Sequence, residues 1–357
     1  MSKLNKLLFI SILIISLTSC DFISGLSNTG SNNENNNVVT ELTFAVAPQI
    51  AWMPWYLANE ENLFNQYSRN IQVKFETDNY QKIIERFLNE EVHAITISNI
   101  DAVAQIVRRD IEVDVILISN GNNGNEAILL PQDVDASVNN LRNKSFALTK
   151  FSTRHYLFDR YLIRNQIPFD EITIANTAET DIPDEFRNNQ EIVGVVAQNP
   201  NLYSLTHTAS AKIIFDSRQI SNEIFDLVIM RRETLLDHPE FAQALLSGWF
   251  AITQKLQGNK KGPTLSGLAS IINLTPEQYA EQLTTTPLND TPAKALAKIR
   301  SRSIRKTMRH IQYFIQRHEL ASDESFTDWV SYPGRNPAIL HFNGQPLQKF
   351  IAPPIKK

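Results

Sequence analysis

The chain has 357 residues, of which 42% are hydrophobic and 20% charged, a composition typical of a globular protein of about two domains. Its 34 Lys and Arg and 38 Asp and Glu give a net charge of −4, which argues against non-specific binding to nucleic acids. A single Cys excludes a disulfide framework, a Cys-based zinc site and an iron–sulfur cluster within one chain. The seven His show no pair at metal-ligand spacing, and the sequence has no phosphate-binding loop or nucleophile elbow. We therefore predict no catalytic residue, no metal and no cofactor.

The N-terminus has the pattern of a secretory signal. Lys3 and Lys6 precede the uncharged run 7–17, which is too short to cross a hydrocarbon core of about 30 Å. The run ends at Leu17-Thr18-Ser19-Cys20, which resembles a bacterial lipobox. That resemblance implies a signal peptide over 1–19, cleavage before Cys20 and a lipid on its sulfur. The alternative is an ordinary signal peptide in which Cys20 is incidental.

Residues 20–38 are predicted to tether the folded body to a membrane. The stretch 24–37 is rich in Asn, Ser and Gly and has little apolar surface to bury, so we expect it to be disordered. A prion-like Asn tract is the other interpretation, but the stretch is short and lacks aromatic residues. Asp21 resembles the residue that retains Gram-negative lipoproteins at the inner membrane. The predicted location is therefore the cell envelope, on the periplasmic face of the inner membrane in a Gram-negative cell.

The first part of the body alternates predicted strands and helices. Strands are predicted from apolar alternation and helices from apolar residues at helical spacing. In chain order these are strand 41–47, helix 52–60, strand 71–76, helix 79–91, strand 93–98, helix 101–109 and strand 113–119. Such alternation indicates parallel β-α units and an α/β class.

The second part repeats the alternation and then becomes helical. It has strand 145–149, helix 154–165, strand 172–175, helix 183–188, strands 192–197, 212–216 and 226–231, and helices 240–257, 264–272, 276–282 and 292–318. The last helix carries a basic cluster, Arg300, Arg302, Arg305, Lys306 and Arg309. We interpret this cluster as a solvated face rather than a nucleic-acid site, because the chain is acidic overall and predicted to be secreted.

Seven short segments carry a resemblance to a known family. They are WMPWYLA at 52–58, AITISNIDA at 94–102, NGNNGNE at 120–126, FSTRHYL at 151–157, VAQNP at 196–200, EIFDL at 223–227 and LHFN at 340–343. In this order they resemble the periplasmic solute-binding proteins of nitrate/sulfonate/taurine ABC importers, which are also similar to thiamine-pyrimidine synthases. The segment at 120–126 resembles a subgroup associated with urea and small amides. Gln198 stands where that subgroup has Trp, and extra residues precede Asn125, so the ligand is not carried over.

The resemblance spans about 42–350 and implies a type II periplasmic-binding-protein fold. Two α/β lobes would be joined by a hinge and enclose an inter-lobe ligand cleft. Lobe 1 would comprise 39–131 and 230–357, and lobe 2 would comprise 132–229.

Candidate ligand-binding residues follow from the motifs and from the rule that ligands sit at the carboxyl ends of strands in open α/β sheets. They are Trp52, Asn99, Asp101, Asn120, Asn122, Asn125, Ser152, Arg154, His155, Asn199 and Asp226.

Several candidates have a structural alternative. Asp101 is as well suited to cap the helix 101–109 as to contact a ligand. The segment 120–125 is also suited to form a plain turn. His155 is suited to a structural hydrogen bond, and Asp226 is suited to a role at the hinge. Trp55, which is close to Trp52 in the sequence, is expected in the core.

The charged candidates leave the ligand class open. Asp101, Glu126 and Asp226 favour a neutral or cationic nitrogen compound, whereas Arg154 favours a carboxylate or sulfonate. The function that the resemblance implies is capture of a small polar organic solute (an amide, an amine or a sulfonate) by a monomeric, lipid-anchored protein. The solute would pass to an ABC permease and its ATPase. The alternatives are a ligand-sensing lipoprotein for a membrane receptor and a pyrimidine-synthase-like enzyme, whose cysteine-rich segment the chain lacks.

Overall fold

The computed structural model describes residues 39–67, 70–318, 329–331 and 337–352, which belong to one unit spanning Val38–Lys357. The predicted signal peptide (1–19), Cys20 and the tether (20–38) lie outside the described residues. No helix in those ranges is long and apolar enough to cross a membrane.

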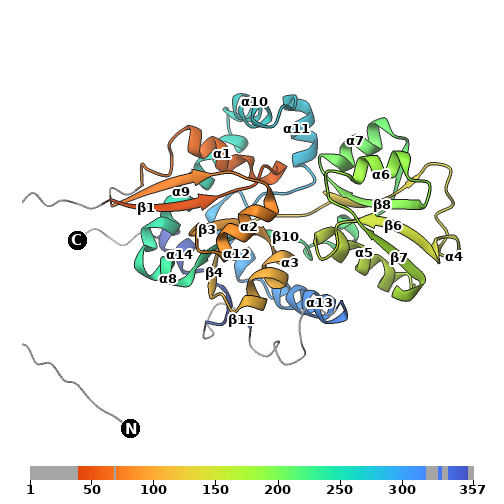
Figure 1. The fold of residues 1–357 in the computed structure, drawn as a ribbon. Coiled ribbons are helices and arrows are strands. Elements are labelled where there is room, and N and C mark those ends of the chain that lie inside the picture. The colour runs from red at the N-terminus through yellow and green to blue at the C-terminus, as the bar shows by residue number, and fades with distance from the viewer. Residues whose placement is uncertain (1–38, 68–69, 319–328, 332–336, 353–357) are drawn as a thin grey trace, which may run out of the picture. The chain divides into compact units, whose positions relative to one another are not determined.

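Seven strands form the first sheet, in the order β11-β12-β4-β10-β3-β1-β2 (Figure 1). They are β1 (Thr40–Ala45), β2 (Ile71–Glu76), β3 (Ala94–Ser98), β4 (Val113–Gly121), β10 (Phe225–Arg231), β11 (Val330–Ser331) and β12 (Leu340–Phe342). β1 pairs in parallel with β2 and β3, whereas β10 is antiparallel to both β3 and β4. The expectation of parallel units is therefore wrong for β10, which enters this sheet from the opposite direction.

Five strands form the second sheet, in the order β7-β6-β8-β5-β9. They are β5 (Glu126–Pro131), β6 (Lys144–Leu148), β7 (Ile172–Asn176), β8 (Ile192–Gln198) and β9 (Ala211–Asp216). β5 is antiparallel to β8 and β9, and the remaining pairs are parallel. β5 is absent from the predicted strands, because its apolar run has only four residues and follows an Asn/Gly turn.

Strand membership locates the two crossings between the sheets at 122–125 and 217–224. The expected lobe boundaries at 131 and 230 lie several residues later. They assign β5 to the first lobe and most of β10 to the second, whereas the ladders join β5 to the second sheet and β10 to the first. Each crossing therefore ends where an antiparallel strand begins.

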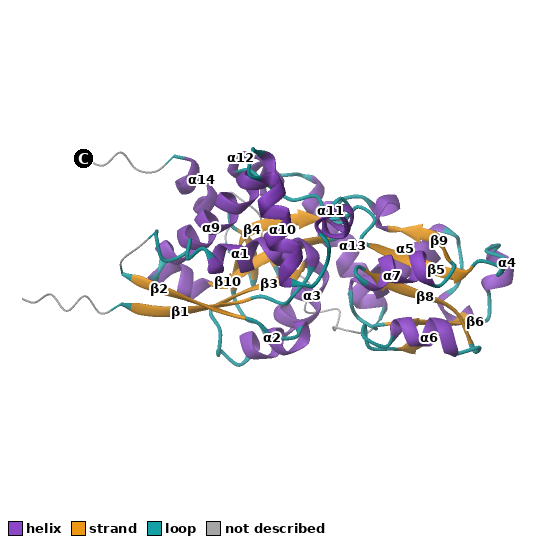
Figure 2. Ribbon diagram, turned by 90° about the horizontal axis from the view of Figure 1, so that it is seen from above, coloured by secondary structure: helices purple, strands orange, loops and turns teal. Residues whose placement is uncertain are grey.

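Each sheet is covered by its own helices (Figures 1 and 2). The first part of the chain contributes α1 (Met53–Glu60), α2 (Tyr80–Leu88) and α3 (Asn99–Asp101), which continues as a π-helical and a 3-10 segment to Arg109. The second sheet has α4 (Val138–Leu141), α5 (Thr153–Arg164), α6 (Ile182–Asn188) and α7 (Asn201–Thr208). The C-terminal part has α8 (Arg232–Asp237), α9 (Pro239–Gln257), α10 (Lys261–Ile271), α11 (Pro276–Leu283), α12 (Pro292–Ile299), α13 (Ser303–Arg317) and α14 (Gln345–Ile351). Short 3-10 turns lie at Ile50–Trp52, Phe169–Glu171 and Ser217–Ile220.

The predicted helix 292–318 is two helices. α12 ends at Ile299, and the backbone N–H of Ser303 donates to the Ser301 hydroxyl at 3.2 Å before α13 begins. A local side-chain acceptor of this kind competes with the helical ladder and breaks it.

α13 reaches α5 of the second sheet. Asp159 of α5 accepts a hydrogen bond from Arg317 Nη1 at 2.6 Å, and its carboxylate lies 3.0 Å from His318 Nε2. Phe314 of α13 packs edge-on against Tyr156 of α5. The C-terminal part of the chain therefore makes a third link to the second sheet, beside the two crossings.

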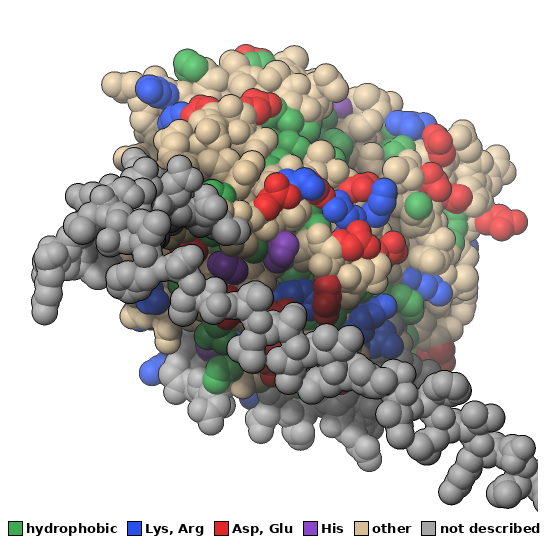
Figure 3. Space-filling model, turned by 60° about the vertical axis from the view of Figure 1, so that its left-hand side comes forward, with side chains coloured by type: hydrophobic (Ala, Val, Ile, Leu, Met, Phe, Trp, Pro, Cys, Tyr) green, Lys and Arg blue, Asp and Glu red, His purple; other side chains and the backbone are tan. Residues whose placement is uncertain are grey.

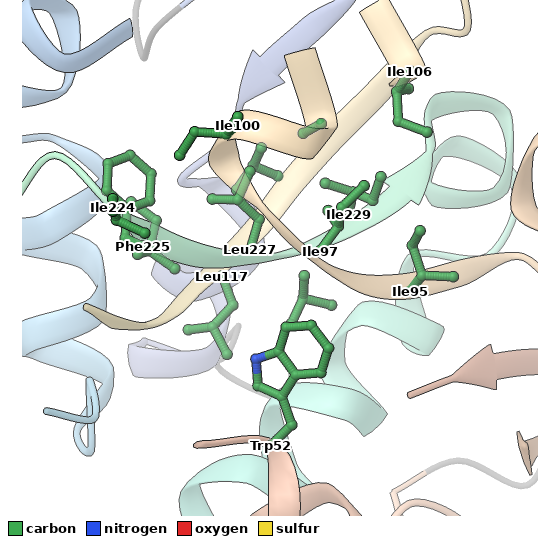
Figure 4. Close-up of a cluster of buried hydrophobic side chains, with 14 of the residues drawn as sticks. Trp52, Ile95, Ile97, Ile100, Ile106, Leu117, Ile224, Phe225, Leu227 and Ile229 are labelled. Carbon is green, nitrogen blue, oxygen red and sulfur yellow. The ribbon is translucent and has the colours of Figure 1, made fainter. Parts of the chain in front are cut away.

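Aromatic and aliphatic side chains fill the core on both faces of the first sheet. Trp55 is fully buried and packs against Phe44 and Trp249, so the prediction that it belongs to the core is confirmed. Figure 4 shows Ile95, Ile97, Leu117, Leu227 and Ile229 gathered around β3, β4 and β10, with Trp52 at the edge of the cluster. Acidic and basic side chains are interspersed on the face seen in Figure 3.

Candidate functional site

A small polar recess lies where loops from both sheets meet. It opens among the segments after β1, β3, β4, β6 and β8 and the first residues of β10. We call it the inner recess; its lining residues are Gln49, Trp52, Tyr80, Ser98, Asp101, Asn122, Asn125, Glu126, Thr153, Arg154, Gln198 and Asp226. About 10 Å³ is open to the centre of a water-sized sphere, which is room for roughly one water molecule.

Asp226 is held by two donors on the same oxygen. Trp52 Nε1 donates to Oδ2 at 3.1 Å and Asn120 Nδ2 donates to it at 2.7 Å. No donor among the described residues is paired with Oδ1. Burial raises the pKa of Asp226 to about 6, even though these hydrogen bonds lower it.

Asp101 is oriented by hydroxyl groups. Tyr80 Oη donates to its Oδ2 at 2.8 Å and Ser98 Oγ donates at 2.7 Å. Ser98 also accepts the backbone N–H of Asp101, so the N-cap of α3 is Ser98 and the alternative of Asp101 as the cap is wrong. Burial and the charge of Asp101 raise the pKa of Tyr80, which keeps its hydroxyl protonated.

Glu126 is the least compensated group of the recess. Glu126 is 1% exposed, and its Oε2 is buried without a hydrogen-bond donor among the described residues. Burial raises the pKa of Glu126 to about 7, although the nearby charge of Arg154 and a hydrogen-bonding contact with the Thr153 side chain both lower it. Asn122 Oδ1 is likewise buried and without a donor. An unpaired buried acceptor costs about 1–3 kcal/mol, so both oxygens are candidates for contact with a ligand.

Arg154 is the cation of the inner recess, and its Nη1 is hydrogen-bonded to neighbouring lining residues. Nη1 donates to Gln198 Oε1 at 2.8 Å and to Thr153 Oγ1 at 3.3 Å. Nε lies 3.2 Å from Glu179 Oε2, an ion pair without hydrogen-bond geometry. Burial alone would lower the pKa of Arg154, but Glu179 and Glu126 hold it above its usual value.

A larger hollow adjoins the inner recess and shares Gln49, Tyr80, Asp101, Arg154 and Gln198 with it. This outer cleft has a volume of about 790 Å³, in the range of small-molecule sites. Its other walls come from both sheets and include Pro48, Ala104, Phe151 and Pro200. A ligand with a small head group in the recess therefore has room for a larger body in the cleft.

The predicted site residues separate into three groups. Trp52, Asp101, Asn122, Asn125, Arg154 and Asp226 line the inner recess, while Ser152 and Asn199 line the outer cleft. Asn99, Asn120 and His155 line neither hollow. Whether the lining residues contact a ligand remains a prediction.

The three residues outside the hollows have structural contacts. Asn99 Nδ2 donates to Glu223 O at 2.9 Å and its Oδ1 accepts from Phe225 N at 3.3 Å, which fixes the second crossing to α3. Asn120 orients Asp226 from behind the recess. His155 Nδ1 accepts from Phe151 N at 3.1 Å, and burial lowers the pKa of His155 to about 3.

Tyr80, Gln49 and Thr153 are lining residues that the predicted set omits. Tyr80 is the first residue of α2, directly after the carboxyl end of β2, so the strand-end rule that found Asn99 also points to it. Gln198 appeared in the sequence only as a departure from a family pattern. Among the described residues, no group of three or more His, Cys, Asp or Glu is arranged to hold a metal ion.

The fold is shared with solved binding proteins. The alkanesulfonate-binding protein SsuA from Xanthomonas axonopodis pv. citri bound to MOPS has a TM-score of 0.64 and 16% identity, and 79% of this chain matches 95% of that one. The periplasmic aliphatic sulphonate binding protein SsuA from Escherichia coli has a TM-score of 0.64 and 15% identity, over 78% of this chain and 88% of that one. The periplasmic sulfonate-binding protein SsuA from Methylobacillus flagellatus KT has a TM-score of 0.65 and 14% identity, over 89% and 96%.

Neither a protein-family model nor a curated protein matches the sequence. At these identities the structural likeness shows the fold, and the fold prediction is confirmed: the chain has the two-lobed α/β architecture of periplasmic binding proteins.

Proposed function

We propose that the chain is the solute-binding lipoprotein of an ABC importer, capturing a small polar organic solute and delivering it to a permease and its ATPase. The observation that carries the proposal is the inner recess, where buried acceptors of Glu126 and Asn122 have no donor among the described residues. A buried polar group left unpaired is costly unless a ligand completes it. The similarity to three sulfonate-binding proteins supports a binding role over catalysis.

The proposed location is the cell envelope, with a monomer anchored through a lipid on Cys20. Asp21 favours the periplasmic face of the inner membrane if the cell is Gram-negative. Membership in the urea and small-amide subgroup remains part of the proposal, because the solved relatives are described as sulfonate binders. We propose no enzymatic activity, no cofactor and no nucleic-acid partner.

Solute uptake by cells tests the proposal. Asp226→Ala removes a recess carboxyl, whereas Asp184→Asn removes a carboxyl whose side chain is 80% exposed on α6 and serves as the matched control. Asp226→Ala is expected to abolish uptake of one solute at unchanged protein level, and Asp184→Asn to leave it normal. Normal uptake of every candidate solute in the Asp226→Ala strain would refute the import role.

The sensor alternative makes a different genetic prediction. Genes for a permease and an ATPase beside this one favour import, whereas a kinase or cyclase gene favours sensing. Retained uptake together with a lost transcriptional response in the Asp226→Ala strain would support the sensor.

A further inference from the structure

We propose that the inner recess binds the primary ammonium group of a small organic amine, with the body of the amine in the outer cleft. This inference rests on the proposed function and names its substrate class. Four observations carry it: the charge balance, the unpaired acceptors, the pairing of three donors within the lining and the size of the recess.

The lining carries more negative than positive charge. Asp101, Glu126 and Asp226 supply three carboxyls against the single guanidinium of Arg154, so the lining has a net charge of −2 when all four groups are ionised. Arg154 is already compensated by Glu179 at 3.2 Å. A bound cation would remove the uncompensated charge, since opposite charges stabilise one another strongly in a buried site.

Three acceptor oxygens of the recess have no hydrogen-bond donor among the described residues. Glu126 Oε2 and Asn122 Oδ1 are buried and unpaired within the described part of the chain, and both hydrogen bonds to Asp226 go to Oδ2 rather than Oδ1. A primary ammonium group has three N–H donors and no acceptor. The three unpaired acceptor oxygens therefore match the three N–H donors of a primary ammonium group in number and kind.

Three donors of the recess are already paired with acceptors of its own lining. Trp52 Nε1 points to Asp226, Tyr80 Oη points to Asp101, and Arg154 Nη1 points to Gln198. A sulfonate offers only acceptors and would meet the three carboxyls, so the sulfonate part of the predicted ligand range is disfavoured for this recess.

Size distinguishes among cations. A recess with room for about one water molecule accepts an ammonium nitrogen, whereas a guanidinium or a trimethylammonium group is several atoms larger. The rings of Trp52 and Tyr80, 5.6 Å apart, form an aromatic wall of the kind that attracts organic cations. The described residues offer no metal-holding cluster, which disfavours an inorganic cation.

Calorimetry on the purified full-length chain tests the inference with one body and several head groups. The probes are butylamine, 1,4-diaminobutane, butanol, butyramide, butanesulfonate and butyltrimethylammonium. At pH 8 we expect the two primary amines to bind at least 10-fold more tightly than the other four. Glu126→Gln and Asp226→Asn are expected to weaken amine binding at least 10-fold, and Asp184→Asn to leave it within 2-fold.

The outcomes separate the inference from the proposed function. No heat from either primary amine up to 10 mM, or equal binding of butanol, overturns the ammonium assignment. Binding of butyramide or butanesulfonate instead overturns it while supporting a solute-binding role. Amine binding that both Glu126→Gln and Asp226→Asn retain overturns the assignment to this recess.

Measuring amine affinity over a series of pH values adds a test, because a purely structural role of Glu126 would not make the affinity depend on pH. Glu126 is faced by Arg154, Thr153, Asp226 and Glu179, and Asp226 by Trp52, Asn120 and Asp101. With the pKa of Glu126 at about 7, its ionised fraction rises roughly 30-fold between pH 5.5 and 8. The affinity for the amine is expected to rise by a similar factor, and amine binding is expected to release a proton near pH 6.5. An affinity that is flat across this range would contradict ammonium contact with Glu126.

Discussion

Replacing Glu126 by Gln should change the free energy of unfolding of the unliganded protein more favourably at pH 8 than at pH 5. Gln keeps the size of the side chain but cannot ionise. The folded pKa of about 7 lies above the ordinary value of 4.5 because the carboxyl is buried. Between these values the folded state holds a proton that the unfolded state has lost. The free energy of unfolding of the wild type therefore falls as pH rises from about 4.5 to 7.

The size of the effect follows from the two pKa values. The ionised form of Glu126 costs the folded state about 3 kcal/mol at pH 8 and less than about 1 kcal/mol at pH 5. The change in the free energy of unfolding caused by Glu126→Gln should therefore be about 2.5 kcal/mol more favourable at pH 8 than at pH 5. Only this difference is predicted, since loss or gain of packing affects both pH values alike.

Urea unfolding of both proteins at pH 5 and pH 8 measures the difference. Asp184→Asn is the control, because its exposed side chain should give the same change at both pH values. A Glu126→Gln effect that is equal at pH 5 and pH 8 would refute the view that an uncompensated carboxylate occupies the recess.

Three further predictions concern the scaffold and the anchor. Gly194→Ala places a Cβ 2.6 Å from the carbonyl oxygen of Leu129, so thermal unfolding should show a loss of about 1–3 kcal/mol, while Gly262→Ala, with open space around it, should not destabilise. Asp159→Asn weakens the link to α13 and should cost about 1–3 kcal/mol in urea unfolding; an unchanged midpoint would contradict it. Cys20→Ser should abolish labelling by radioactive palmitate and release the protein from membranes; continued labelling would exclude Cys20 as the acceptor.

Local sequence patterns predicted most of the elements but not how they pair. Strand 71–76 has the bounds of β2, because alternation and turn residues define it locally. β5 was missed since only its pairing with β8 and β9 distinguishes its four apolar residues from a loop. The antiparallel entry of β10 also depends on contacts more than a hundred residues apart.

The site was predictable to the extent that it follows strand ends. Trp52 and Asp101 were found this way and line the recess, whereas Asp226, near the beginning of β10, was a candidate from the family resemblance. Asn99 and His155 satisfy the same rule, yet their side chains turn toward the second crossing and toward α13. The direction of a side chain depends on its packed neighbours, which a single sequence does not specify.

The third link between the lobes bears on how wide the cleft can open. Two adjacent crossings alone would act as a simple pivot, free to swing until side chains collide. The contacts of Arg317 and His318 with Asp159 join α13 to α5 outside the two crossings, so a movement that separates these helices must first break an ion pair in which Asp159 is buried and Arg317 is partly exposed. Breaking such a contact costs energy. Movements of the lobes that keep α13 against α5 should therefore be favoured over movements that separate the two helices.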